Sequence, residues 1–291
     1  MSKISEFAVI DKSAKIGSDV TIGPFCVIGP DVTIQDGCEL MNNVTVQGVT
    51  VIGRSNVFYP NAVIGVAPQD LKYNGAPTQT IIGNDNVVRE NCTIHRGTEL
   101  GGGKTVMGNN NLIMAGAHIA HDCILDDHIL LSNQVMLAGH VRIERGAVVS
   151  ALAGVHHFVS IGLHSYVAAM TPVRRDVPPF VKVAGDPPEV RGLNNEGLSR
   201  NGYSRQDIDQ LKQAYKKLFR NSSQTGNIVT QLDELEADDS LNKHVRYLCQ
   251  FVRRSCQSRF NRALEASRGD RPEDRCQKDP AEIREKHKLS G

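Results

Sequence analysis

Residues 8–37 read AVIDKS AKIGSD VTIGPF CVIGPD VTIQDG, five hexads in which the third residue is always isoleucine. The same frame continues to Ile64 and resumes at Ile82 after a break at residues 68–79. A period of six fits neither a 3.6-residue helix nor an ordinary alternating strand. It fits a solenoid of short parallel strands, in which every sixth side chain points into a narrow shared core. The sequence therefore predicts a mainly β fold.

The later part of the frame carries more specific expectations. We expect Leu100 and Val106 to occupy core positions, the frame to slip by one residue at residues 109–111, and the repeat then to run from Ile113 to Val173. Glycine is frequent at the fourth position, which predicts turns with positive φ there. Small residues fill most first positions, and four cysteines are expected there as compact hydrophobes: Cys26, Cys38, Cys92 and Cys123.

Composition and charge narrow the class of protein. The 291 residues include no tryptophan and only 5% aromatics, so the core must be aliphatic. A net charge of +1 gives no global attraction to nucleic acid, and no apolar run is long enough for a membrane span or a signal peptide. We therefore expect a cytoplasmic protein. Residues 174–220 hold ten basic and six acidic side chains, a net +4 that could attract an acidic partner.

The chain is predicted to fall into three parts. Residues 1–190 form the solenoid. Residues 68–79 form a long loop that leaves it, and because long loops in regular folds commonly carry function, we expect this loop to be functional. Residues 191–266 form a small α-helical domain, in which Ser204 and Asp207 match a capping signature. Residues 267–291 are charged and are expected to be disordered.

Histidines converge on one edge of the predicted solenoid. If three hexads make one turn, residues 18 apart stack, so His121 and His157 lie two turns apart with His140 on the turn between. His118 and His156 lie beside them. Three interpretations are open: surface histidines, a zinc site, or general-base catalysis in which Asp122 orients the His121 ring.

The repeat resembles the left-handed parallel β-helix of hexapeptide-repeat acyltransferases. Within that group, six strings in order resemble motifs of the UDP-N-acetylglucosamine O-acyltransferase family, the first enzyme of lipid A synthesis: QDLKYNGAPT, CTIHRGTELGGG, GAHIAHDC, LAGHV, GVHHF and NNEGLSRNGYS. The resemblance covers about residues 5–220. It implies transfer of a 3-hydroxyacyl group from acyl carrier protein to the 3-hydroxyl of UDP-N-acetylglucosamine, without metal or cofactor, by a homotrimer.

The resemblance also implies residue roles. His121 would be the general base, Asp122 its support, and the Gly139 N–H the oxyanion donor. The implied substrate-binding residues are Gln69, Asp70 and Lys72 for the sugar, Asn194, Glu196 and Arg200 for the nucleotide, and the histidines His95, His118, His140, His156 and His157. His157 and Asn201 depart from the family pattern, in which glutamine and arginine are common. Acyl carrier protein would dock on basic residues of the +4 segment: Arg174, Arg175, Lys212, Lys216, Lys217 and Arg220.

Several alternatives stay open at this level. One is a zinc-dependent protein like the gamma-class carbonic anhydrases, whose H-x-x-x-x-H spacing differs from the H-x-x-H of His118 and His121. Others are an acyltransferase that acts on a 3-amino sugar nucleotide or later in the pathway, for which an extra N-terminal domain is expected, and a non-catalytic scaffold. The family's acyl-length position falls near Ala169 and Met170, where a residue larger than glycine hints at a shorter chain.

Overall fold

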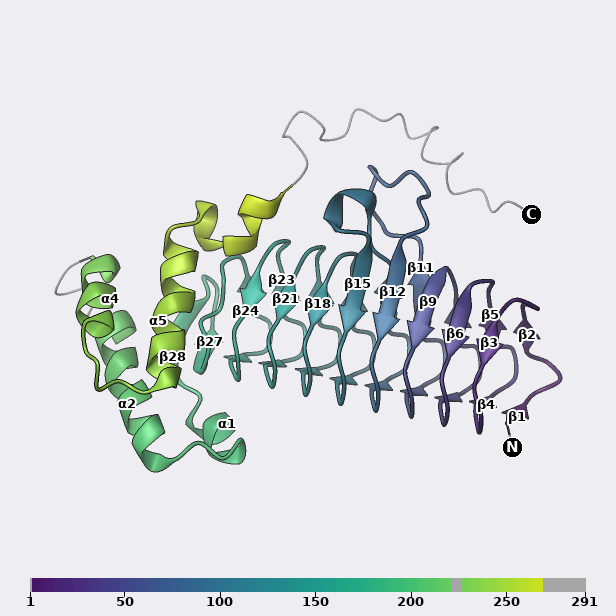
Figure 1. The fold of residues 1–291 in the computed structure, drawn as a ribbon, viewed down its shortest axis with the longest axis horizontal. Coiled ribbons are helices and arrows are strands. Elements are labelled where there is room, and N and C mark those ends of the chain that lie inside the picture. Colours follow the sequence, from purple (N-terminus) through teal and green to yellow (C-terminus); the bar gives the residue numbers. More distant parts are fainter. Residues whose placement is uncertain (1, 221–226, 269–291) are drawn as a thin grey trace.

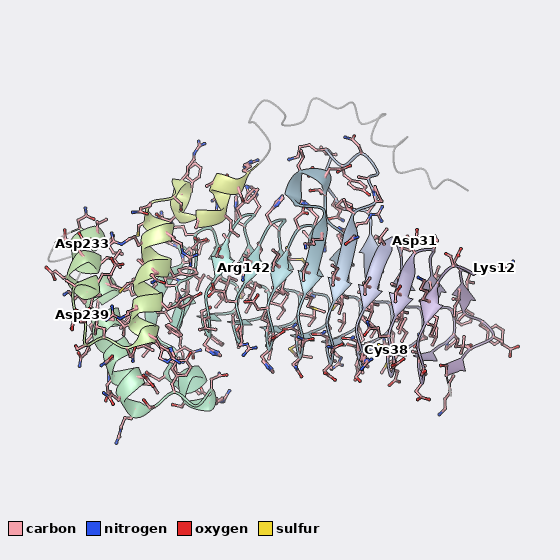
Figure 2. All side chains as sticks on the ribbon, viewed as in Figure 1. Lys12, Asp31, Cys38, Arg142, Asp233 and Asp239 are labelled. Atoms are coloured by element: carbon pink, nitrogen blue, oxygen red, sulfur yellow. The ribbon has the colours of Figure 1, made fainter. Side chains whose placement is uncertain are left out.

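The computed structural model describes residues 2–220 and 227–268. In these residues the chain winds into a three-sided prism whose faces are an eleven-, a nine- and an eight-stranded sheet, with helices gathered at the C-terminal end (Figure 1). Figure 2 shows the outward side chains along the whole prism. All neighbouring strands are parallel except the last pair, β27 (Val181–Ala184) and β28 (Glu189–Leu193).

The strands are short and follow one another around the three faces. The eleven-stranded sheet also contains β1 (Lys3–Ile4), β4 (Thr21–Ile22), β7 (Glu39–Leu40), β10 (Val57–Phe58), β13 (Val87–Val88), β16 (Leu112–Ile113), β19 (Leu130–Leu131), β22 (Val148–Val149) and β25 (Tyr166–Val167). The nine-stranded sheet contains β2 (Val9–Ile10), β5 (Val27–Ile28), β8 (Thr45–Val46), β11 (Val63–Val66), β14 (Thr93–His95), β17 (His118–Ile119), β20 (Met136–Leu137), β23 (Gly154–Val155) and β26 (Pro172–Val173). The eight-stranded sheet contains β3 (Lys15–Ile16), β6 (Val32–Ile34), β9 (Val49–Ile52), β12 (Gln79–Ile82), β15 (Lys104–Met107), β18 (Ile124–Leu125), β21 (Arg142–Ile143) and β24 (Ser160–Ile161).

The hexad frame explains this architecture. Ile16 pairs with Ile34 and Ile22 with Leu40, so partners lie 18 residues apart and three hexads make one coil. The third-position side chains of successive coils stack into one continuous aliphatic core. Backbone N–H groups donate to the next coil, as from Gly23 to the Leu40 carbonyl at 2.8 Å. The predicted β-solenoid is confirmed.

Two excursions interrupt the coils, and only the first was expected. Ile52 pairs with Ile82, a separation of 30 residues, so residues 68–79 leave the coil without changing its phase. Ile82 pairs with Met107, a separation of 25, so seven further residues leave the coil between β14 and β15. This second excursion includes the 3-10 turn η1 (Glu99–Gly101).

The second excursion overturns part of the predicted frame. Leu100 lies on η1 with 52% of its surface exposed, and Val106 faces outward, while Met107 is buried in the core. From Met107 to Ile113 the period of six is regular, so the predicted slip at residues 109–111 is wrong. The slip lies instead in the excursion itself, where Gly102 and Gly103 adopt positive φ and turn the chain back.

The prediction for fourth-position glycines is also wrong at most of these positions, and it holds at Gly65, where φ is 74°. Positive φ occurs at the sixth position, as at Asp19, Phe25 and Asp31, and not at Gly17 or Gly23. Those two glycines are needed because the next coil passes close by. A Cβ at Gly17 would lie 2.8 Å from the Asp36 nitrogen, and one at Gly23 would lie 2.9 Å from the Met41 carbonyl.

The first-position cysteines behave as predicted. Cys26, Cys38, Cys92 and Cys123 are buried in the core, and the cysteines of the described residues are free thiols. Burial raises the pKa of Cys92 to about 11 and that of Cys123 to about 12, so neither is a ready nucleophile.

A small helical region follows the solenoid. It contains α1 (Asn195–Arg200), α2 (Arg205–Tyr215), the π-helical turn η2 (Lys216–Arg220), α4 (Ile228–Glu236), α5 (Lys243–Cys256) and the 3-10 turns η3 (Arg259–Asn261) and η4 (Ala263–Ser267). The predicted capping box is present, since the side chains of Ser204 and Asp207 each bond the other's backbone N–H. In the described part of the chain, no helix is both long and apolar enough to span a bilayer.

The predicted division into domains stays a prediction. A second hydrophobic core forms among the helices and the last strands, around Phe180, Leu198, Leu211 and Leu248. Tyr247 of α5 donates a hydrogen bond to Glu144 of the solenoid at 2.6 Å. Most of the tail predicted to be disordered, residues 269–291, lies outside the described residues.

Candidate active site

The histidines lie on one edge of the prism in two neighbouring rows. Asp122, His140 and Phe158 occupy equivalent positions of successive coils, and all three have positive φ near 60°. The His121 carbonyl accepts from His140 N–H at 3.0 Å, and the Gly139 carbonyl accepts from Phe158 N–H at 3.3 Å. The predicted line of imidazoles is therefore a cluster, because His140 belongs to the row beside that of His121.

His121 and Asp122 form a hydrogen-bonded pair. His121 Nδ1 lies 2.8 Å from Asp122 Oδ2, and the carboxylate is buried. Because a carboxylate can only accept, Nδ1 carries the proton, and in the neutral form of the ring Nε2 keeps its lone pair. The sharp corner at Asp122 makes this contact between chain neighbours possible, since neighbours on a straight strand point apart.

The second excursion holds the Asp122 carboxylate. Thr98 donates its backbone N–H to Oδ1 at 2.9 Å and its hydroxyl to Oδ2 at 2.6 Å. The backbone N–H of Asp122 donates to Thr105 Oγ1 at 2.8 Å. A Cβ at Gly101 would overlap the carboxylate, so glycine is required there. These contacts fix the carboxylate and, through it, the orientation of the His121 ring.

Gly139 lies directly against the His121 ring. A Cβ at this position would be 2.7 Å from Nε2 and 3.0 Å from Nδ1. Within the described residues, no hydrogen bond from the Gly139 N–H is found. The Gly139 backbone, whose N–H has no partner among the described residues, therefore lies against the His121 ring.

A groove of about 500 Å³, which we call the histidine groove, starts at His121 and runs across four coils. Its floor is a register row of the nine-stranded sheet: His118, Met136, Gly154 and Pro172. Gln69, His156 and Arg174 also line it. The walls are largely apolar away from the histidines, so the groove suits a flexible apolar chain.

The two excursions pack against each other beside this edge. Glu99 Oε1 accepts the N–H groups of Asn74 and Ala76 at 3.1 and 3.3 Å. Arg96 donates to the Tyr73 hydroxyl at 3.0 Å. These contacts connect the excursion that holds Asp122 to the loop at 68–79.

Asp70 and Lys72, two predicted sugar-binding residues, form an ion pair of 3.9 Å on the loop. Burial lowers the pKa of His140, and the charges of Asp122, Lys72 and Asp70 also act on it, so the loop pair lies close to this histidine. His140 stacks on Phe158 with 4.3 Å between ring centroids, and its Nε2 lies 3.9 Å from Asp122 Oδ2.

His95 and His118 lie next to the pair, and both have lowered pKa values. Burial lowers the pKa of His118, and it lowers that of His95 to about 4, with His118, His121 and Arg96 adding to the shift. The two rings meet edge to face at 4.8 Å. Thr93 Oγ1 lies 2.6 Å from His118 Nδ1 and fixes that ring in the groove.

His156 lies in the groove, whereas His157 faces a second cavity beyond it. Burial lowers the pKa of His157 to about 4, and the neighbouring His156 and two arginines, Arg268 and Arg262, lower it further against the effect of Glu265. The departure from the family pattern at His157 therefore affects the second cavity rather than the His121 pair.

Three predicted nucleotide-binding residues are not brought to the groove of the same chain. Asn194 is the buried N-cap of α1, where it accepts from Gly197 N–H and donates to the His164 carbonyl at 2.9 Å. Glu196 and Arg200 form an exposed ion pair on α1. In Figure 1, α1 and the loop at 68–79 project from opposite sides of the prism.

His121, Asp122 and His140 also satisfy the geometry of a metal site. One ligand atom from each lies within 4.8 Å of the other two. Both carboxylate oxygens of Asp122 already accept hydrogen bonds, so the buried charge is compensated by protein groups alone.

Sequence reasoning missed the residues that support Asp122. Thr98 and Gly101 lie on an excursion that the hexad frame predicts to be regular coil, so the frame does not predict their contact with Asp122. The run of three glycines at residues 101–103 was the available signal. Phe158 stacks on the His140 ring. This contact can be predicted from the 18-residue period once the residues at the corners of the prism are known.

Comparisons with known proteins identify the family to which this chain is similar. A family model described as UDP N-acetylglucosamine O-acyltransferase, domain 2, matches residues 176–260, and a model of the GMPPB C-terminal domain matches residues 4–106. An acyl-[acyl-carrier-protein]–UDP-N-acetylglucosamine O-acyltransferase of Stutzerimonas stutzeri is 46% identical over 237 residues, 81% of this chain and 92% of the relative.

Solved structures give the same result. A UDP-N-acetylglucosamine acyltransferase from Bacteroides fragilis matches with a TM-score of 0.81 and 35% identity, over 86% of this chain and 96% of that one. The Arabidopsis UDP-N-acetylglucosamine acyltransferase matches with a TM-score of 0.78 and 36% identity, over 88% and 97%.

The fold and the histidine edge thus define a left-handed β-helix of the hexapeptide-repeat acyltransferase class, with a small C-terminal helical region. Within that class, the chain belongs to the UDP-N-acetylglucosamine O-acyltransferase family. The predicted family resemblance is confirmed.

Proposed function

We propose that this chain transfers a 3-hydroxyacyl group from acyl carrier protein to the 3-hydroxyl of UDP-N-acetylglucosamine, the first step of lipid A synthesis, in the cytoplasm. The observation that carries the proposal is the His121–Asp122 pair, held at the end of an apolar groove with Gly139 against its ring. A base, a hydrogen-bond donor and an acyl-sized groove meet at one point. Thioester alcoholysis needs these three features.

His121 acts as the general base. Its Nε2 takes the proton of the sugar hydroxyl while that oxygen attacks the thioester carbonyl. Asp122, held by Thr98, stabilises the imidazolium that forms. When the tetrahedral intermediate collapses, the new ester forms and the carbon–sulfur bond breaks. His121 then returns the proton to the departing thiolate, which restores the free base.

The Gly139 N–H stabilises the oxyanion of the intermediate. This donor has no partner among the described residues and belongs to a residue that lies against the His121 ring, so base and donor can act on the same carbonyl. The acyl chain extends along the histidine groove over Met136, Gly154 and Pro172. Asp70 and Lys72 of the loop, with Gln69, bind the sugar, and His118, His140 and His156 line the pocket; buried His95 supports His118.

The active enzyme is a homotrimer with each site between two subunits. Support comes from Asn194, Glu196 and Arg200, which lie far from the groove of their own chain and need a second copy to approach a nucleotide there. Met170 and Leu152, which stand 18 residues apart on one edge, are 73% and 54% exposed and suit a subunit contact. Sedimentation equilibrium of the purified chain tests this assembly.

Acyl carrier protein docks on the basic face near the end of the groove. Arg174, Arg175, Lys212, Lys216 and Arg220 are exposed, and Arg174 also lines the groove. Lys217 is less available because it pairs with Glu234 at 2.7 Å. An acidic donor protein would be attracted to the remaining cluster.

The decisive experiment supplies the purified chain with UDP-N-acetylglucosamine and a series of acyl–acyl carrier proteins, and identifies the product by mass spectrometry. We expect an ester at the 3-hydroxyl, and His121→Ala to lower kcat at least ~10²-fold. Transfer at the wild-type rate by His121→Ala would exclude the base, and absence of any product from all donors would exclude the function. A 3-amino sugar nucleotide as a parallel acceptor distinguishes amide from ester formation.

A further inference from the structure

A second cavity of about 650 Å³, which we call the arginine pocket, adjoins the histidine groove. One wall comes from the solenoid at His156 and His157, and the other from the segment after α5, at Arg259, Arg262, Glu265 and Arg268. His156 lines both cavities, so the arginine pocket opens beside the groove that starts at His121.

The segment after α5 is fixed to the solenoid. The Asn261 carbonyl accepts the Asp176 N–H at 2.8 Å, and the Ala263 N–H donates to Asp176 Oδ2 at 2.9 Å. Arg262, which is buried, donates to the Arg174 carbonyl at 3.2 Å. Figure 1 shows this segment, in yellow, turning back from α5 over the last coils. The arginines therefore have defined positions beside the groove.

Among the described residues that line the pocket, arginines outnumber carboxylates. Three arginines face one glutamate, and Glu265 is shared by Arg262 at 2.7 Å and Arg268 at 3.1 Å. Among the described residues, the ion pairs of this pocket involve Arg262 and Arg268, and none involves Arg259. The guanidinium groups of Arg259 and Arg262 lie 4.7 and 5.1 Å from the ring centroid of Phe260, so one aromatic ring orients both.

Backbone strain accompanies this arrangement. Phe260 and Asn261 are consecutive non-glycine residues with φ of 60° and 53°, in the left-handed region that such residues rarely adopt. The Phe260 ring is 55% exposed, so burial of the ring does not offset the strain. Strained backbone of this kind persists where the structure needs a particular side-chain placement, here the aromatic platform for two arginines.

We propose that the arginine pocket binds the phosphate ester of a substrate whose reacting end lies beside His121. Guanidinium groups match phosphate oxygens in a bidentate geometry, and the cavity has room for such a group. This inference rests on the proposed function, whose two substrates each carry phosphate: the diphosphate of the sugar nucleotide and the phosphodiester of the carrier protein's prosthetic arm. Arg262, Glu265 and Arg268 lie past residue 260, where the match to the family model ends.

The kinetic test compares two double variants of the full chain. Arg259→Gln/Arg268→Gln removes two charges of the pocket and leaves buried Arg262 in place. Lys12→Gln/Arg54→Gln removes two exposed charges from the first coils and serves as the matched control. The donors are an acyl-phosphopantetheine and the corresponding acyl-pantetheine, which lacks the phosphate.

If the donor's phosphate occupies the pocket, the first variant raises KM for acyl-phosphopantetheine about tenfold per arginine and leaves acyl-pantetheine unchanged. If the nucleotide occupies it, KM for UDP-N-acetylglucosamine rises instead. Either result supports the pocket, and the control variant should show neither. Unchanged KM for all substrates, or an equal rise for acyl-pantetheine and its phosphorylated form, would overturn the proposal.

Calorimetry with phosphopantetheine and with UDP-N-acetylglucosamine separates this proposal from the proposed function, because it needs no turnover. We expect one of these probes to bind the wild-type chain at least tenfold more tightly than Arg259→Gln/Arg268→Gln. If this difference in affinity is found but the chain shows no acyl transfer, the proposed function is wrong and the proposed phosphate site in the arginine pocket is supported. Equal affinity of both proteins for both probes would remove the pocket, whatever the activity.

Discussion

Gly139→Ala is the most direct test of how the active site is built. The added methyl would lie 2.7 Å from His121 Nε2 and 3.0 Å from Nδ1, whereas ordinary contacts between such atoms need about 3.5–4.0 Å. The ring must therefore move by roughly 1 Å. Asp122 cannot follow, because Thr98 holds both of its carboxylate oxygens. The 2.8 Å hydrogen bond between the pair is lost.

A displacement of roughly 1 Å at a catalytic group costs about 10²-fold in rate, or ~2.7 kcal/mol of transition-state stabilisation. We expect kcat for acyl transfer, measured by mass spectrometry at saturating substrates, to fall by this factor. The ring lies at the edge of an open groove and can swing outward. The free energy of unfolding should therefore fall by only about 1 kcal/mol.

Gly192→Ala on β28 is the matched control, because a Cβ there meets no heavy atom within 4 Å and the residue does not have positive φ. The double variant His121→Ala/Gly139→Ala should be no slower than His121→Ala, since both changes act through one ring. Retention of kcat within about threefold of wild type by Gly139→Ala would refute the reasoning. Either the ring would then not lie over Gly139, or His121 would not be the base.

Four further outcomes follow from the geometry. Met107→Ala should lower the free energy of unfolding, measured in urea, by about 2–5 kcal/mol, whereas Leu100→Ala should change it by less than about 0.5 kcal/mol. A larger loss for Leu100→Ala would mean that Leu100, not Met107, occupies the core. Thr98→Val removes a hydroxyl donor to Asp122 and should lower kcat about tenfold, with recovery in Thr98→Ser; equal rates for both variants would contradict this role. The pKa of His95 is lowered to about 4, so as the pH falls the unfolded chain binds a proton at this residue before the folded chain does. The free energy of unfolding should therefore decline from pH ~6.5 towards pH 4, by up to about 3 kcal/mol more in wild type than in His95→Gln. Parallel pH profiles of the two proteins would contradict this prediction. Dialysis against a chelator should leave transfer unchanged, whereas loss of activity restored by zinc would assign the His121, Asp122 and His140 trio to a metal.

The repeat made most of the fold predictable, because a period of six leaves few alternatives and the loop at 68–79 preserves its phase. The same regularity concealed the second excursion. Leu100 falls on a third position by chance, and seven extra residues look like one hexad followed by a slip. Only the three-dimensional structure distinguishes an excursion of seven residues from a regular hexad followed by a slip, because it shows Leu100 exposed to solvent and Met107 buried in the core.

The sequence likewise predicted part of the active site, the His121–Asp122 pair, but not the residues that hold it in place. Adjacency in sequence suggested that Asp122 orients His121, and the corner at Asp122 provides the contact. Thr98 contacts Asp122 from 24 residues away, an offset that the 18-residue period does not contain. Asn194, by contrast, has a local role as a helix cap that explains it fully within one chain, so its predicted contact with a nucleotide depends on a second subunit.

The histidine groove runs along the prism axis, across β17, β20, β23 and β26, so every coil adds one rung to its length. Successive coils are spaced like paired strands, ~4.8 Å apart, which is roughly the length of four methylene groups. Gain or loss of one 18-residue coil would therefore change the accommodated acyl chain in steps of about four carbons. Side-chain substitutions on the groove floor, as at Gly154, would adjust it within a step. Acyl selectivity in such a solenoid can thus evolve by duplication of whole coils as well as by point mutation.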